Sequence, residues 1–64
     1  MEQLPRIKVL CVDDHSLIRD GIASALDEQG DMELVAQACN GREAIAEFRQ
    51  FRPDVTLMLS LIHI

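Results

Sequence analysis

The 64-residue sequence has no cluster of basic residues. Six lysines and arginines stand against eleven aspartates and glutamates, which gives a net charge of −5 at pH 7. Proteins bind the phosphate backbone of DNA or RNA through clustered positive charge. We therefore expect that these residues contact no nucleic acid.

The sequence also lacks a long apolar run. The longest, Val55 to Ile64, is interrupted by Thr56, Ser60 and His63. It is shorter than the ~20 residues that a membrane-spanning helix needs. No basic stretch followed by an apolar segment opens the chain, as it would in a signal peptide. We therefore expect no membrane contact and a cytoplasmic location.

Only two cysteines are present, and Cys11 and Cys39 are too far apart for a zinc or redox motif. Both lie in apolar runs, which predicts two buried, reduced thiols. The three glycines are isolated, so there is no glycine-rich phosphate loop. No serine or cysteine nucleophile has a plausible histidine and acid partner, and we expect no enzyme activity.

In the first half of the chain, the spacing of apolar residues changes from a pattern typical of a strand to one typical of a helix. Ile7 to Val12 is almost continuously apolar, which is typical of a strand buried on both faces. From Ser16 the apolar residues follow helical spacing, and Gly30 is a plausible helix stop. The predicted helical stripe contains Ile18, Ile22, Ala25 and Leu26.

The second half repeats this alternation. Met32 to Ala38 has a period of two with one more polar face, which predicts an edge strand. Asn40 and Glu43 resemble a capping box at the start of a second helix. Its apolar stripe is Ala44, Ile45, Phe48 and Phe51. Pro53 ends this helix, and Val55 to Leu59 is the third predicted strand.

The resulting order is β-α-β-α-β with short connections, in one small α/β domain. Right-handed crossovers make it the first half of a doubly wound parallel sheet. Ligands of such sheets bind beyond the carboxyl ends of the strands. The candidate site is therefore formed by Asp13, Asp14 and the residue that ends the third strand.

The acidic pair Asp13 and Asp14 is the main chemical signal. Two ionised carboxylates in a cleft repel each other, and burial would raise the pKa of one of them. Mg²⁺ relieves this repulsion and leaves coordination positions open for phosphate oxygens. In the alternative interpretation, Asp14 caps the first helix and Asp13 is a solvated turn residue. The spacing alone leaves both interpretations open.

Two other chemistries that begin after a first strand do not fit. A phosphatase nucleophile motif, Asp-x-Asp, would need an acid where His15 stands. A corrinoid-binding motif, Asp-x-His-x-x-Gly, would need glycine at the position of Ile18. We interpret His15 as a surface residue beside the acidic pair.

Two segments, RIKVLCVDDHSLIRDGIASAL and ELVAQACNGREAIAEFRQFRPDVTLM, resemble the receiver domain of bacterial two-component response regulators. The subgroup with a LuxR-type helix-turn-helix output is the most similar. The resemblance implies a flavodoxin-like fold with strand order 2-1-3. It also implies that Asp14 binds Mg²⁺ directly and Asp13 largely through water. In this family, an aspartate at the end of strand three accepts a phosphoryl group from a sensor histidine kinase.

The chain departs from the family pattern at this third aspartate, where it has Leu59. An alkyl side chain is no nucleophile, so we expect no phosphorylation of this chain and weak Mg²⁺ binding at best. The chain would then be a fragment of a phosphorelay regulator of transcription. The alternative is a phosphate-independent pseudo-receiver that acts as a protein-docking module. The oligomeric state is left open.

The last six residues, Leu59 to Ile64, are unusual in themselves. The codons CTG TCT CTT ATA CAC ATC encode this string, and they resemble a transposase-end adapter of sequencing libraries. We therefore expect a truncated receiver domain over residues 1–58 and a non-native tail over residues 59–64. The nucleotide sequence downstream of codon 58 tests this hypothesis.

Overall fold

The computed structural model describes residues 5–59 as a three-stranded sheet with two helices. The elements are β1 (Ile7–Val12), α1 (Ser16–Gln29), β2 (Met32–Ala38), α2 (Gly41–Phe51) and β3 (Val55–Met58). The strand order is β2-β1-β3 and both pairings are parallel, which confirms the predicted half of a doubly wound sheet.

The predicted boundaries hold with one small difference. The third strand ends at Met58, one residue before the predicted end. Residues 60–64, most of the predicted tail, lie outside the described residues, so the boundary at residue 58 stays a prediction. In the described part of the chain, no helix is long and apolar enough to cross a membrane.

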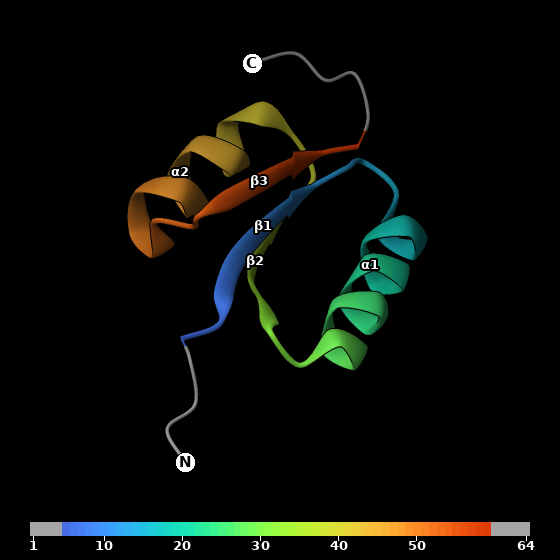
Figure 1. Ribbon diagram of the computed structural model, residues 1–64. Coiled ribbons are helices and arrows are strands. Elements are labelled where there is room, and N and C mark those ends of the chain that lie inside the picture. The colour runs from blue at the N-terminus through green and yellow to red at the C-terminus, as the bar shows by residue number, and fades with distance from the viewer. Residues whose placement is uncertain (1–4, 60–64) are drawn as a thin grey trace.

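The core is built around β1, the central strand. The two helices lie on opposite faces of the sheet (Figure 1), so β1 is covered on both sides. Val9 to Val12 are each at most 2% exposed as a result. Leu10 and Val12 pack with the small side chains Ala36, Ala38 and Ala44 on the face covered by α2. Strand alternation places Cys11 on the other face, toward α1.

The apolar stripe predicted for α1 does not form part of this buried core. No residue of α1 is fully buried, and Ile18 is 45% exposed. Within the described residues, α1 packs only on β1 and the edge strand β2, and no further element covers it. One side of its stripe therefore faces solvent.

The start of α2 confirms the predicted capping box with a shift of one residue. The side-chain oxygen of Asn40 accepts a hydrogen bond from the Glu43 backbone N–H at 2.9 Å. Glu43 in turn accepts from the backbone N–H of Cys39 at 3.0 Å, rather than from that of Asn40. The backbone N–H groups of Glu43 and Cys39 therefore both have an acceptor, and the two hydrogen bonds join the end of β2 to the start of α2.

The prediction of two buried thiols is right for one cysteine only. Cys11 is fully buried, which raises the pKa of its thiol. Cys39 is only half-buried, because it lies at the carboxyl end of β2, past the strand's pairing with β1. Its thiol donates to Glu43 Oε1 at 3.1 Å, and this hydrogen bond raises the pKa of Cys39. Both thiols are free.

The turn after α2 sets the position of β3. Arg52 adopts a left-handed conformation with φ 48°, and its N–H donates to Phe48 O at 2.8 Å. Pro53 then prevents a further helical turn. Asp54 bonds Lys8 twice, from its N–H to Lys8 O at 2.8 Å and from the Lys8 N–H to its Oδ2 at 2.9 Å.

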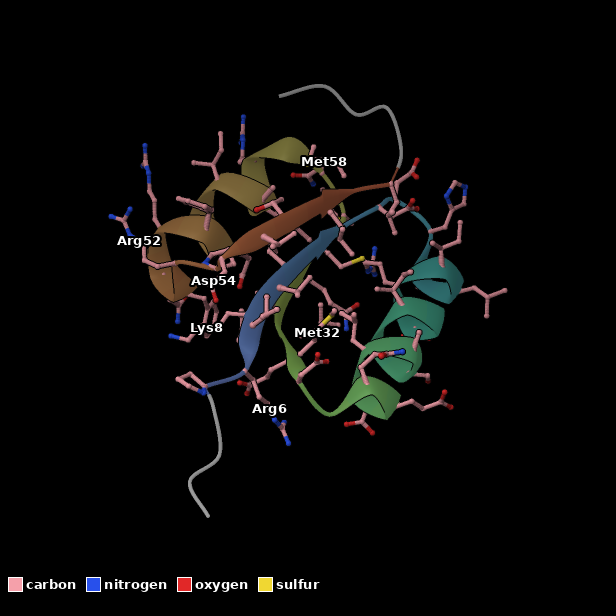
Figure 2. The ribbon with its side chains drawn as sticks, viewed as in Figure 1. Arg6, Lys8, Met32, Arg52, Asp54 and Met58 are labelled. Atoms are coloured by element: carbon pink, nitrogen blue, oxygen red, sulfur yellow. The ribbon has the colours of Figure 1, made fainter. Side chains whose placement is uncertain are left out.

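Figure 2 shows Lys8 and Asp54 next to each other, at the end of the sheet away from Met58. The two hydrogen bonds between them fix the register of β3 on β1, which pairs Val12 with Met58. The carboxyl ends of both strands therefore meet at one edge of the sheet.

Candidate functional site

Asp13 is a buried carboxylate at the end of the central strand. Asp13 is only 1% exposed as a whole residue. Its N–H donates to Ala38 O at 3.0 Å, which extends the pairing of β1 with β2. Its Oδ1 accepts from the His15 N–H at 2.7 Å and lies 2.9 Å from His15 Nδ1. The interpretation of Asp13 as a solvated turn residue is therefore wrong.

The expected rise of a carboxyl pKa by burial does not occur at Asp13. The hydrogen bond from the His15 backbone favours the ionised form and holds the pKa of Asp13 below its usual range. Burial acts in the opposite direction but is the weaker cause. The side chain is therefore ionised at neutral pH although it is buried.

Asp14 faces solvent, with a side chain that is 56% exposed. It does not cap α1, because the residue at the cap position is His15, which makes no capping hydrogen bond with its side chain. Oδ1 of Asp14 instead lies 2.9 Å from His15 Nδ1. The alternative interpretation of Asp14 as a helix cap is therefore also wrong.

Asp13, Asp14 and His15 form one cluster whose potential ligand atoms all lie within 4.8 Å of one another. His15 is 64% exposed in its side chain, as predicted for a surface residue, but its Nδ1 contacts both carboxylates. Both acids, Asp13 first through its hydrogen bond, raise the pKa of His15. The cluster therefore offers two carboxylates to a hard cation, and His15 partly balances their charge without one.

Leu59 lies beside this cluster. Its N–H donates to Val12 O at 3.0 Å, directly before Asp13, and the residue is 41% exposed. The structure thus brings the end of the third strand next to the acidic pair, as the parallel topology predicted. The leucine side chain has no polar atom, so it supplies neither a metal ligand nor a nucleophile.

Two residues at this edge were not identified from the sequence. Arg19 donates from Nη1 to the backbone oxygen of Asp13 at 2.6 Å and from Nε to Gln37 Oε1 at 3.2 Å. Arg19 lies outside the apolar stripe predicted for this helix, and it belongs to none of the motifs considered. One signal was available, since a basic residue near a helix N-terminus is disfavoured by the helix dipole.

We predict that the pKa of His15 in the folded, metal-free chain lies above its ordinary value of 6.5. Asp13→Asn should move it back toward that value, because the largest cause of the rise is the hydrogen bond to Asp13. Titration of the imidazole signals by NMR measures both values, and His15→Gln assigns the signal. An unchanged pKa in Asp13→Asn would contradict the prediction.

Asp13 and His15 also make the stability of the fold depend on pH, in opposite directions. The lowered pKa of Asp13 stabilises the fold above the carboxyl's ordinary pKa and is lost as pH falls. The raised pKa of His15 stabilises it below the ordinary imidazole pKa and is lost as pH rises. The contribution of the pair is therefore largest between about pH 4 and pH 6.5.

Comparisons with known proteins agree with this arrangement. The family model of the response regulator receiver domain matches residues 9–59. The response regulator protein VraR of Staphylococcus aureus, in strains Mu3, COL and N315, is 50% identical over 52 residues, which are 81% of this chain. These residues cover 25% of each relative, so the chain spans about a quarter of the length of the curated relatives it matches. Because the family model matches most of the chain, the chain belongs to the response regulator receiver domain family.

Proposed function

We propose that this chain is the amino-terminal part of a receiver domain in a two-component phosphorelay. The parent protein would take a phosphoryl group from a sensor histidine kinase and regulate transcription. The family match and the acidic pair at the end of β1 support this function. The two free thiols are typical of a reducing compartment, which supports a cytoplasmic location.

The single observation that carries the proposal is the pairing of a buried, ionised Asp13 with an exposed Asp14 at the carboxyl edge. Asp14 would contact Mg²⁺ directly and Asp13 largely through water. The cation would neutralise negative charge on the phosphoryl oxygens during transfer. Asp13 already accepts hydrogen bonds from His15, and only two carboxylates are present. The affinity of this chain for Mg²⁺ is therefore weak.

In this proposal, the chain itself accepts no phosphoryl group and has no enzyme activity. Transfer requires a carboxylate oxygen that attacks phosphorus in line. Leu59 stands beside Asp13 where that carboxylate would be needed. The proposal keeps residues 1–58 as the receiver part and residues 59–64 as a non-native tail.

Incubation of the chain with acetyl phosphate and Mg²⁺ tests this proposal. We expect the intact mass to stay unchanged, because Leu59 offers no carboxylate nucleophile beside the acidic pair. In parallel, an NMR titration with Mg²⁺ should shift the amide signals of Asp14 and His15 at high concentration only. Asp14→Asn serves as the control and should abolish these shifts. A phosphoryl adduct on the chain would refute the first claim, and shifts unaffected by Asp14→Asn would refute the second.

A docking module is the second candidate function, and one observation favours it. Apolar side chains of α2 and β3 stay exposed beside each other, with Ile45 at 42%, Phe48 at 42% and Met58 at 46%. Together with β3, whose described pairing is to β1 alone, they form a surface that a protein partner can cover. A defined oligomeric state in solution would favour this function.

A further inference from the structure

Polar contacts through one residue attach α1 to the edge that carries the acidic pair. No residue of α1 is fully buried. Within residues 5–59, Arg19 is the one α1 residue whose side chain hydrogen-bonds to the sheet or to the turn after β1. Its Nη1 donates to Asp13 O at 2.6 Å, and its Nε donates to Gln37 Oε1 at 3.2 Å. The guanidinium therefore joins three segments, α1, the acidic turn and β2.

Arg19 stabilises the position of Asp13 through a hydrogen bond from outside the turn. The Asp13 N–H is bonded to Ala38 O, and its Oδ1 is bonded by His15, two residues further along the same turn. The carbonyl of Asp13 is bonded by Arg19. Because Gln37 orients the guanidinium from β2, this carbonyl is fixed relative to the sheet. The direction of the carbonyl in turn sets where Asp14 lies.

Arg19 achieves this without neutralising the carboxylates. An arginine close to two aspartates would ordinarily pair with their side chains. In the part of the chain that the structure describes, the ion pairs of Asp13 and Asp14 are with His15 and none is with an arginine or lysine. The two donors of Arg19 go to a backbone carbonyl and an amide oxygen instead, so Arg19 itself occupies neither carboxylate.

We propose that Arg19 is a positioning residue, which holds the Asp13–Asp14 turn in the geometry that binds a divalent cation. This inference rests on the proposed Mg²⁺ site. It predicts that loss of Arg19 weakens Mg²⁺ binding, whereas the change of charge alone predicts stronger binding. Loss of a nearby positive charge favours cation binding, whereas loss of a support for the ligands weakens metal binding by about 10- to 100-fold.

Four variants of the full chain test the proposal: Arg19→Gln, Arg19→Lys, Gln37→Ala and the control Arg49→Gln. Mg²⁺ titrations followed by NMR should show about tenfold weaker binding in Arg19→Gln. Arg19→Lys should also bind more weakly, because an ammonium does not reproduce the planar two-donor geometry. Gln37→Ala should give a smaller loss. Arg49, on the exposed side of α2, should leave Mg²⁺ binding unchanged or slightly stronger.

Hydrogen exchange of the Asp13 amide gives a second readout that needs no metal. It should be faster in Arg19→Gln than in the unaltered chain or in Arg49→Gln, because the turn loses the link to β2 that Arg19 provides and keeps only its hydrogen bond to Ala38. Equal or tighter Mg²⁺ binding in Arg19→Gln, with unchanged exchange at Asp13, would overturn the proposal. If Arg19→Gln does not fold, Arg19→Lys and Gln37→Ala make the same comparison.

The two readouts also separate this inference from the proposed function. No Mg²⁺ response in the unaltered chain would refute the proposed metal site. Faster exchange at Asp13 in Arg19→Gln would then still show that Arg19 holds the turn. A clear Mg²⁺ response that none of the Arg19 or Gln37 variants alters would refute the role of Arg19 and leave the metal site standing.

Discussion

Leu59→Asp should raise the affinity of the chain for Mg²⁺ at least about tenfold, because affinity for hard cations rises with the number of charged ligands. The backbone of residue 59 is already bonded to Val12, directly before Asp13, so no change of register is needed. The position is 41% exposed, which leaves room for a carboxylate and for water around a cation. Isothermal titration calorimetry measures the change in affinity.

The same substitution should make folding depend on Mg²⁺. Without the cation, a third carboxylate beside Asp13 and Asp14 adds like-charge repulsion and lowers the melting temperature. A ligand that binds only the folded state stabilises it by about 2.7 kcal/mol at one hundred times its Kd. Thermal melts in EDTA and in excess Mg²⁺ should therefore differ much more in Leu59→Asp than in the unaltered chain.

Leu59→Asn is the matched control, because it has nearly the same shape as the aspartate variant but no charge. It should gain little Mg²⁺ affinity, and its melting temperature should respond to Mg²⁺ as weakly as that of the unaltered chain. If the aspartate and asparagine variants bind Mg²⁺ equally, residue 59 does not lie within reach of the cation and the proposed site is wrong.

Leu10→Ala should unfold most of the protein. Leu10 is 1% exposed and belongs to the core cluster. Truncation of a buried leucine to alanine costs about 2–5 kcal/mol, whereas the core of so small a domain supplies only about 3–5 kcal/mol net. The expected result is the loss of a cooperative transition in urea or heat, followed by circular dichroism.

Leu17→Ala makes the same chemical change at an exposed position and is the control. Leu17 lies in the first turn of α1 and is 81% exposed. Surface substitutions of this kind change stability by less than about 0.5 kcal/mol, so the unfolding curve should stay almost unchanged. A Leu10→Ala chain that melts like Leu17→Ala would show that the β1 core contributes little to stability.

The order of elements could be predicted because each has a local cause. The unbroken apolar run of β1 requires cover on both faces, and the Asn40–Glu43 pair starts a helix through its own hydrogen bonds. The burial of α1 could not be predicted in this way. An apolar stripe shows which side of a helix faces the sheet, but the elements that pack against the helix decide how much of that stripe is covered.

The acidic pair was found from the sequence for a topological reason, since the carboxyl ends of parallel strands meet at one edge. The burial and the hydrogen-bond partners of each acid could not be found from the sequence. Asp13 is buried and ionised because the His15 backbone donates to it, and Asp14 turns toward His15 instead of capping α1. The sequence spacing is the same for these arrangements and for the alternatives, so it does not distinguish them.

By itself, then, the sequence determined the alternation of strands and helices along the chain, the edge of the sheet where chemistry is possible, and the absence of a carboxylate at Leu59. These depend on side-chain type and on short-range periodicity, which are properties of the chain alone. Only the tertiary structure decided which acid is buried, how His15 lies between the two carboxylates, and that Arg19 reaches both Asp13 and Gln37. The burial of Asp13 and the contacts of Arg19 depend on residues of different elements, so they exist only once α1 and β2 have packed around β1. The contacts of His15 lie within one turn, whose conformation the sequence spacing does not fix.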